Sequence, residues 1–235
     1  MIEFPSNTRN ILVTGGAGFI GGAVVRRLLK NSSLKIFTLD KMGYASDLTS
    51  IKQVLSKTDH LEKGRYEVLN VDLFNKEATT NALLRADPDL VMHLAAESHV
   101  DRSIDSPSKF LNSNIVGTFN LLQAALLHWE SLPGERKDRF RFHHVSTDEV
   151  FGSLGSKGFF SEKSPYAPSS PYSASKAASD HLVNSWHHTY GLPIVITNCS
   201  NNFGPWQFPE KLIPVVILKA IAGETIPLYG DGKNI

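Results

Sequence analysis

Short apolar runs alternate along this chain with longer segments whose apolar residues recur at helical spacing. The runs predict buried β-strands, and the longer segments predict helices between them. Such an alternation is typical of βαβ units, which wind into a parallel sheet covered by helices on both faces. We therefore expect a doubly wound, Rossmann-like α/β fold. The predicted strands are residues 10–14, 35–39, 66–70, 90–94, 140–146 and 193–198, and the predicted helices are residues 19–30, 107–129, 171–190 and 209–222.

The last part of the chain breaks this pattern. Residues 226–229 predict a further strand, and the Gly-Asp-Gly-Lys-Asn segment at 230–234 predicts a turn. A strand without a partner is poorly stabilised. We therefore expect that the chain lacks a C-terminal portion, or that the partner strand comes from elsewhere. Loops rich in Gly, Pro, Ser and charge are expected at residues 131–138 and 152–170.

Composition excludes several classes of protein. The chain has 235 residues, is 41% hydrophobic and 20% charged, and carries a net charge of +1 without a basic stripe, so nucleic acid is not an expected partner. Its apolar segment at 212–222 is too short for a membrane span. The chain starts with a polar segment rather than a signal peptide. Cys199 is the one cysteine, which fits a reducing, cytoplasmic location.

A glycine-rich segment follows the first predicted strand. Gly15, Gly18 and Gly21 have the spacing of a dinucleotide-binding turn, in which glycines allow a tight turn and close approach of the backbone to a pyrophosphate. The start of the next helix can bind that anion. Asp40 ends the second strand, where a carboxylate can bind ribose hydroxyls and repel a 2′-phosphate. NAD is therefore the expected cofactor. Asp72 ends the third strand and can meet an adenine edge or simply cap the strand.

Tyr172 and Lys176 are four residues apart on a predicted helix and therefore share one face. A phenol is a poor base at neutral pH, because its reference pKa is near 10. We expect the Lys176 ammonium, with a positively charged nicotinamide, to lower the pKa of Tyr172. The phenolate could then take a proton from an alcohol while hydride leaves the carbon.

Asp148 and Glu149 follow the fifth predicted strand. An acidic pair at such a position is often a solvated turn or a helix cap. In a parallel sheet, however, it faces the crevice in which ligands bind. Oxidation of an alcohol needs no such pair, whereas removal of a proton beside a ketone with loss of hydroxide needs an acid and a base. The pair therefore favours a dehydratase that works through internal oxidation and reduction.

Other polar residues give weaker signals. The nine histidines lack a supporting set of cysteines or carboxylates, so no metal site is expected. His99, Asp101 and Arg102 could contact a substrate or form surface ion pairs.

The motifs together resemble those of the extended short-chain dehydrogenase/reductases that act on nucleotide sugars. The resemblance is strongest to the dTDP-glucose 4,6-dehydratase family, and its Thr-Asp-Glu triplet separates dehydratases from the related 4-epimerases. The segments that carry the resemblance are residues 14–21, 93–103, 146–150, 167–176, 197–202 and 209–214.

This resemblance implies an NAD-dependent hydro-lyase in deoxysugar biosynthesis. Tyr172, helped by Lys176 and Thr147, would take the C4 hydroxyl proton as hydride moves from C4 to NAD. Glu149 would remove and later return the C5 proton, and Asp148 would protonate the departing C6 hydroxyl. The implied cofactor residues are Gly15, Gly18, Phe19, Ile20, Gly21, Asp40, Lys41, Met42, Gly43, Asp72, Leu73, Leu94, Ala95, Ala96, Glu97, Ser98, Ser113, Tyr172, Lys176 and Asn202, and the implied substrate residues are Ser98, Thr147, Asn201, Lys211, Leu212, Pro227, Leu228 and Tyr229.

The resemblance also implies a division of the chain. Residues 1–200 would form the NAD-binding domain with the catalytic groups, and residues 201–235 the start of a truncated substrate-binding region. The family continues beyond this point with a segment that completes the nucleotide-sugar site. A homodimer through the helices at 107–129 and 171–190 is implied. Two alternatives stay open: another nucleotide-sugar dehydratase or 4-epimerase, and an inactive, truncated NAD-binding module.

Overall fold

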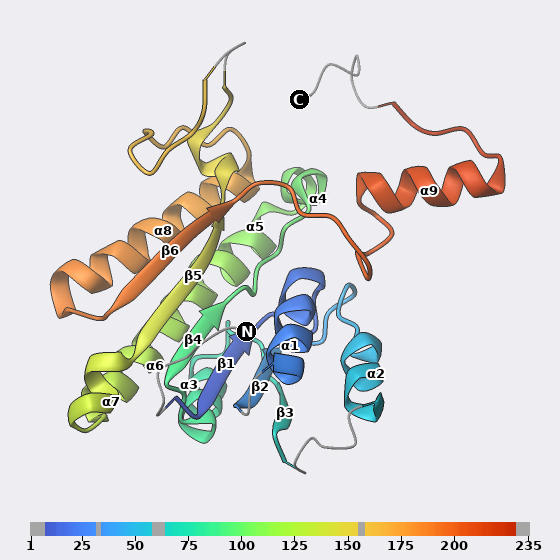
Figure 1. The fold of residues 1–235 in the computed structure, drawn as a ribbon. Coiled ribbons are helices and arrows are strands. Elements are labelled where there is room, and N and C mark those ends of the chain that lie inside the picture. The colour runs from blue at the N-terminus through green and yellow to red at the C-terminus, as the bar shows by residue number, and fades with distance from the viewer. Residues whose placement is uncertain (1–7, 32–33, 58–63, 155–157, 229–235) are drawn as a thin grey trace. The chain divides into compact units, whose positions relative to one another are not determined.

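The computed structural model describes residues 8–31, 34–57, 64–154 and 158–228. The chain divides into two compact units, residues 1–200 and 201–235. The first unit holds a parallel sheet with the strand order β3-β2-β1-β4-β5-β6 (Figure 1). This is the predicted Rossmann-like arrangement. The strands are β1 (Asn10–Thr14), β2 (Lys35–Asp40), β3 (Tyr66–Asn70), β4 (Leu90–His93), β5 (Arg141–Thr147) and β6 (Ile194–Cys199).

Helices connect the strands and cover the sheet. The pattern analysis missed α2, α3 and α4, which are short or weakly apolar. Within the described part of the chain, no helix is long and apolar enough to span a membrane. The helices of the first unit are α1 (Phe19–Asn31), α2 (Thr49–Lys57), α3 (Lys76–Ala86), α4 (Val100–Asp105), α5 (Pro107–Phe110), the π-helix η1 (Leu111–Val116), α6 (Gly117–Ser131), α7 (Gly134–Arg139), the 3₁₀ helix η2 (Asp148–Phe151) and α8 (Pro171–Tyr190). The second unit contains α9 (Leu212–Ala222).

The sheet has a separate apolar core on each face. Alternate residues of a strand point to opposite faces, and β1 shows this directly. Ile11 and Val13 are fully buried in a cluster with residues of α1 and α2. Leu12, between them, is fully buried in the larger cluster that α3, α6 and α8 complete. Strand β1 is therefore buried on both faces and fixes the middle of the sheet.

The prediction of one regular helix over residues 107–129 is wrong in detail, because the π-helix η1 separates α5 from α6. Asn114 lies in η1 with only 2% of its surface exposed. Its side-chain amide accepts from Glu97 N and donates to Glu97 O. Its backbone carbonyl accepts a hydrogen bond from Ser179 Oγ at 2.7 Å. These tertiary bonds explain the wider turn, which sequence periodicity does not reveal.

Three further segments differ from the predictions. Residues 131–138, predicted as a loop, contain part of α7, which an i,i+4 ion pair between Glu135 and Arg139 supports. Helix α9 begins at Leu212 rather than at residue 209. The described residues 226–228 are not in a strand, and the described part of the second unit contains no strand that they could pair with. Tyr229 and the turn expected at 230–234 lie outside the described residues.

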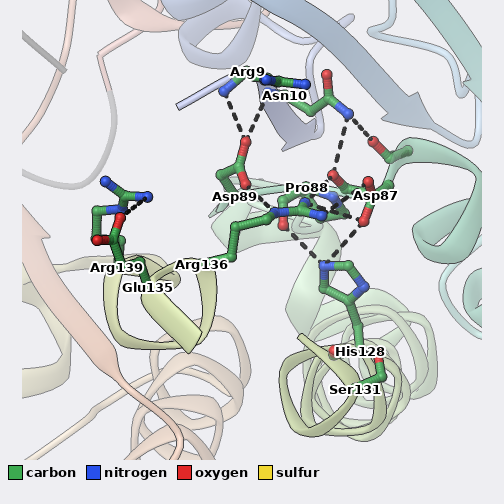
Figure 2. A network of polar contacts seen from close by, with 11 residues as sticks. Arg9, Asn10, Asp87, Pro88, Asp89, His128, Ser131, Glu135, Arg136 and Arg139 are labelled. Carbon is green, nitrogen blue, oxygen red and sulfur yellow. Dashed lines mark hydrogen bonds and ion pairs between the residues drawn. The ribbon is translucent and has the colours of Figure 1, made fainter. Parts of the chain in front are cut away.

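A polar network holds the amino-terminal edge of the sheet together (Figure 2). Asp89 accepts hydrogen bonds from the backbone N–H groups of Arg9 and Asn10 at 2.7 and 3.1 Å. Arg136 of α7 reaches Asp89 at 2.8 Å and Asp87 at 3.1 Å. The network therefore joins α7 to the segments that start β1 and β4.

Candidate functional site

The predicted functional residues of the first unit lie at the carboxyl edge of the sheet. The glycine turn follows β1, and Asp40 ends β2. The segment at 94–98 follows β4, and Thr147 ends β5. Because β1 pairs with both β2 and β4, and β4 pairs with β5, these strand ends are neighbours. Ligands bind at this edge in open parallel sheets.

The glycine turn passes close to the segment after β4. Gly15 has a φ of 67°, and a Cβ atom there would lie 2.7 Å from Ala95 N. A Cβ atom at Gly21 would lie 2.1 Å from Gly15 O, so helix α1 also depends on glycine. At Gly18 a Cβ atom would meet only Gly15 O, at 3.2 Å. The outer side of Gly18 is therefore open for the close approach of a ligand.

The start of α1 can receive an anion. Its first turn contains no acidic residue, so nothing there opposes the positive end of the helix dipole. Unpaired N–H groups of such a turn bind phosphate. The turn and the helix therefore fit a pyrophosphate group.

Asp40 organises the loop after β2. The residue is 7% exposed. Its Oδ2 accepts from Ala17 N at 3.0 Å, and its Oδ1 accepts from Met42 N at 2.9 Å and from Ser46 Oγ at 2.8 Å. A carboxylate has about four acceptor positions, so one remains for a ribose hydroxyl. Met42 has a φ of 54°, a left-handed conformation that is uncommon outside glycine and often marks a functional site.

The loops after β2 and β4 are joined by an ion pair. Lys41 Nζ lies 2.5 Å from Glu97 Oε1, and the Glu97 backbone is held by Asn114.

Asp72, after β3, makes a capping contact, which was the alternative to its predicted contact with an adenine edge. Its Oδ1 accepts from Phe74 N at 2.9 Å. Asp72 is exposed, whereas the adjacent Leu73 is buried.

The predicted catalytic residues converge at the end of β5. Thr147 caps η2, because its Oγ1 accepts from Glu149 N at 3.3 Å. Asp148 and Glu149 form the first turn of η2. Tyr172 lies in the first turn of α8, where Thr147, Asp148 and Glu149 all influence the pKa of its phenol. The structure therefore brings a phenol, a hydroxyl and two carboxyl groups together.

Helix α8 is positioned by its own start and by β5. Ser170 and Ser173 form a capping box, and Pro171 occupies the first turn. One turn further on, Lys176 is 4% exposed and its Nζ donates to Val145 O at 3.0 Å. This bond ties the lysine to the strand that carries Thr147. Residues 171–190 form the helix that the sequence predicts.

Burial disfavours the charged forms of both residues of the Tyr172–Lys176 pair. Burial raises the pKa of the Tyr172 phenol, the negative charge of Glu149 raises it further, and the hydrogen bond with Thr147 partly opposes the rise. Lys176 is not among the groups that change this pKa, and the expected lowering by Lys176 together with a nicotinamide charge stays a prediction. Burial also lowers the pKa of Lys176 to about 8, although Asp180 acts in the opposite direction. A phenolate at this position needs a positive charge beyond those of the chain.

A buried polar cluster that the sequence analysis missed lies behind Lys176. Asp180 is fully buried and accepts hydrogen bonds from His144 Nε2 at 3.0 Å, Ser146 Oγ at 2.8 Å and Tyr166 Oη at 2.9 Å. These bonds help to hold the pKa of Asp180 below its usual range although burial acts against them. One signal was available, since Asp180 lies on the helix face of Tyr172 and Lys176, four residues after the lysine.

Several predicted residues are outside this arrangement. His99 caps α4, with its Nδ1 3.5 Å from Arg102 N, and the Arg102 guanidinium lies 4.0 Å from the centre of the Tyr44 ring. Ser98 lies in the segment after β4, and Ser113 lies in η1. The remaining residues, Asn201, Asn202, Lys211, Leu212, Pro227 and Leu228, belong to the second unit, so the first unit does not contain them.

Residues 12–235 match the family model of GDP-mannose 4,6 dehydratases. A dTDP-glucose 4,6-dehydratase of Neisseria meningitidis is 54% identical over 228 residues, which are 97% of this chain and 62% of that protein. A crystal structure of a dTDP-glucose 4,6-dehydratase of Bacillus anthracis in complex with NAD is similar, with a TM-score of 0.81 and 38% identity over 96% of this chain and 66% of that one.

A more distant solved structure is a UDP-glucose 4-epimerase of Thermus thermophilus in complex with NAD. It matches with a TM-score of 0.75 and 30% identity over 92% of this chain and 64% of that one. The chain thus spans less than two thirds of the length of these relatives.

Proposed function

The chain belongs to the GDP-mannose 4,6 dehydratase family, and from this premise we propose that it carries out the reaction of a dTDP-glucose 4,6-dehydratase. The reaction converts dTDP-glucose to dTDP-4-dehydro-6-deoxyglucose and water. One observation carries the proposal: Asp148 and Glu149, in the first turn of η2, both raise the pKa of the Tyr172 phenol, so two carboxyl groups accompany the phenol at the end of β5. A site for alcohol oxidation alone would not need the two carboxyl groups. Among the solved structures, the 38% identity to a dehydratase, against 30% to an epimerase, supports the same choice.

The residues of the site can divide the chemistry among them. Tyr172 takes the proton of the C4 hydroxyl, and Lys176 keeps positive charge near the phenolate. The resulting ketone acidifies the C5 hydrogen, which Glu149 removes. Asp148 protonates the C6 hydroxyl, which leaves as water, and Glu149 returns its proton to C5.

The carboxyl edge fits NAD as the cofactor. Gly15 and Gly18 would lie against the pyrophosphate, with the start of α1 beside it, and Asp40 would accept from a ribose hydroxyl. Bound NAD would accept the C4 hydride and return it to C6, and its positive charge would favour the Tyr172 phenolate. The solved dehydratase relative in complex with NAD supports this assignment.

The Gly18→Ala substitution tests the cofactor proposal. The added methyl group would occupy the open side of the turn, so we expect NAD affinity to fall by about tenfold or more, roughly 1.4 kcal/mol. Gly22→Ala is the matched control, because a Cβ atom there meets the flexible Arg26 side chain at 3.3 Å. Isothermal titration calorimetry measures both. Equal affinities of the two variants for NAD would contradict the placement of the pyrophosphate at Gly18.

We also propose the roles of the two units and the assembly. The first unit would bind NAD and hold the catalytic groups, and the second would begin a substrate-binding region. A cytoplasmic homodimer through α5–α6 and α8 fits the resemblance, and sedimentation would test it. A monomer would contradict the dimer.

Product analysis tests the reaction. The chain is incubated with NAD and dTDP-glucose, and in parallel with UDP-glucose and GDP-mannose. We expect a 4-keto-6-deoxy sugar from dTDP-glucose, detected by mass loss of one water and by the absorbance of the keto sugar in base. An epimerised sugar without loss of water would sink the dehydratase assignment. Binding of NAD without any turnover would favour an inactive NAD-binding module.

A further inference from the structure

Lys41 directly follows Asp40, the carboxylate expected to bind ribose hydroxyls. The loop that carries the lysine is fixed at this place, because Asp40 Oδ1 accepts from Met42 N at 2.9 Å and from Ser46 Oγ at 2.8 Å. The Lys41 side chain runs past Gly43, where an added Cβ atom would lie 3.6 Å from Lys41 Cε. A positive charge is therefore anchored next to the carboxylate of the expected ribose site.

Glu97 pairs with this positive charge. Lys41 Nζ lies 2.5 Å from Glu97 Oε1, a short, charge-assisted hydrogen bond. The Glu97 side chain is 18% exposed, against 39% for that of Lys41. The Glu97 backbone is also held by the Asn114 side chain, with bonds of 2.8 and 3.0 Å. The carboxylate is therefore the more fixed member of the pair, and it holds the lysine ammonium toward the segment after β4.

The cofactors NAD and NADP differ by one group at the ribose site. NADP carries a phosphate on the 2′-oxygen of the adenosine ribose, where NAD has a hydroxyl. A carboxylate near the end of β2 favours the hydroxyl, and proteins that use NADP place a basic side chain nearby for the phosphate. Lys41 has the position of such a side chain, but Glu97 neutralises its charge. Asp40, Lys41 and Glu97 together carry one net negative charge, which opposes a phosphate.

We propose that Glu97 is a specificity-determining residue for the cofactor, because its carboxylate withholds the Lys41 ammonium from a 2′-phosphate. The inference rests on the proposed binding of NAD at this edge of the sheet. Without the negative charge of Glu97, the ammonium can turn toward the ribose and pair with the phosphate. Asp40 thus selects NAD directly, and Glu97 selects it through Lys41.

The loop after β2 has a second contact with the segment that follows β4. The Arg102 guanidinium of α4 lies 4.0 Å from the centre of the Tyr44 ring, a cation–π distance. Neither this contact nor the hydrogen bonds to Asp40 involve Glu97. In Glu97→Gln the two bonds of the residue 97 backbone to η1 also remain possible. The substitution should therefore release the Lys41 ammonium and leave the loop in place.

Binding of NAD and NADP to Glu97→Gln and to the unsubstituted chain tests the proposal. Isothermal titration calorimetry gives each Kd, with competition against NAD where NADP binds weakly. We expect the ratio of the NADP Kd to the NAD Kd to fall about fivefold or more in Glu97→Gln, the effect of one charge close to the phosphate, and to rise in Lys41→Met. High salt should reduce both changes, because the ion pair is partly exposed.

Glu67→Gln is the matched control. Glu67 lies near the amino end of β3 and pairs with Arg85 Nε at 2.6 Å, with 26% of its side chain exposed. The control removes the same charge from an ion pair of similar exposure, but from a place remote from the expected ribose site. We expect it to leave the ratio unchanged. A fall in the ratio equal to that of Glu97→Gln would show that the effect is not specific to Glu97 and would overturn the inference.

The double variant Lys41→Met/Glu97→Gln identifies the route of the effect. Because Glu97 is proposed to act through Lys41, Glu97→Gln should change the ratio less when the lysine is absent. An equal change in both backgrounds, or an unchanged ratio in Glu97→Gln alone, would overturn the inference and leave NAD as the cofactor. Absence of NAD binding by the unsubstituted chain would instead overturn the cofactor assignment, and the inference with it. The measurement needs no turnover, so it applies equally to an active dehydratase and to an inactive NAD-binding module.

Discussion

The two edges of the sheet both contain ionisable groups, but the surroundings change the pKa values of these groups in opposite ways. At the amino edge, the positive charge of Arg136 lies beside the negative charges of Asp87 and Asp89. Its own pKa is raised because the hydrogen bonds that it donates to Asp87 and Asp89, and their negative charges, outweigh its burial. The pKa of Asp89 is lowered, although burial acts to raise it, because N–H groups of Arg9 and Asn10 and the guanidinium of Arg136 outweigh that effect.

At the carboxyl edge, burial is the stronger influence. It raises the pKa of Tyr172 and lowers that of Lys176 to about 8. Thr147 opposes the rise of the Tyr172 pKa and the Asp180 carboxylate opposes the fall of the Lys176 pKa, but neither outweighs burial. The amino edge therefore stabilises the ionised forms and the fold, whereas the carboxyl edge holds groups close to neutrality and ready to exchange protons. The following predictions test this contrast, from the largest expected effect to the smallest.

Tyr172→Phe should abolish most activity and leave stability nearly unchanged. The substitution removes the proton acceptor, which is worth about 10²–10⁴-fold in rate, while the edge-on ring contact with Phe110 remains. Steady-state assays with dTDP-glucose and thermal unfolding measure the two effects. Tyr166→Phe is the control, because its hydroxyl donates to Asp180 rather than to a group that reacts. Equal rate losses in the two variants would contradict the assigned base.

Arg136→Leu should lower the stability of the fold and leave activity nearly unchanged, the opposite of Tyr172→Phe. Asp87 and Asp89 would lose their guanidinium partner, at a cost of about 1–3 kcal/mol in the free energy of unfolding. Urea unfolding measures this cost. Arg139→Leu, in the same helix, removes only the pair with Glu135 and should cost about 0.5 kcal/mol or less. If both variants lose the same stability, the network does not have the structural role assigned to it.

Activity should fall as the pH rises through about 8, because Lys176 loses its positive charge there. Asp180→Asn removes a negative charge that favours the lysine ammonium, so the midpoint of this fall should move to lower pH. A pH–rate profile of both proteins checks the shift, with the exposed Asp105→Asn as control. An unchanged midpoint in Asp180→Asn would show that Asp180 does not influence the charge of Lys176.

The same lysine should affect stability in the alkaline range. Between about pH 8 and the pKa of an unfolded lysine, near 10.4, the unfolded chain binds more protons at this position than the folded chain. Stability contributed by Lys176 therefore rises with pH across this window. Unfolding measured with Lys176→Met should show a flatter dependence on pH.

The smallest effect is expected at Asp89 in acid. Its pKa is lowered on folding, so its contribution to stability is present above the unfolded value of about 3.9 and is lost as the pH falls through the folded value. Urea unfolding between pH 5 and 2 should show a shallower slope for Asp89→Asn than for the unsubstituted chain. Identical slopes would mean that this carboxylate is not linked to folding.

Local patterns predicted the parts of the site that depend on neighbours in sequence. The glycine turn, the strand-end Asp40 and the shared face of Tyr172 and Lys176 all follow from spacing along one strand or helix. The match of residues 171–190 to α8 reflects a strong start signal, Ser170 followed by Pro171.

Features made by distant contacts could not be predicted in this way. Asp180 binds His144 across 36 positions, and Asn114 binds Glu97 across 17, so no local pattern indicates either bond. The raised pKa of Tyr172 was also missed, because burial is a property of the folded chain. A paired ammonium suggests a lowered pKa, whereas burial and Glu149 raise the pKa of Tyr172 in the folded chain.

The π-helix η1 rotates the side chains of α6 around the helix axis relative to those of α5, compared with one continuous α-helix over Pro107–Ser131. One residue rotates a helix by about 100°, so the extra residue in the wide turn lets Phe110 contact Tyr172 while Leu122 and Ala125 enter the core. A change of one residue in the length of this segment would therefore affect residues outside it. Deleting one residue from Leu111–Val116 would restore a regular helix and turn either the Phe110 ring away from Tyr172 or the apolar face of α6 away from the sheet. Natural variation in this segment should thus change residue identity but conserve length.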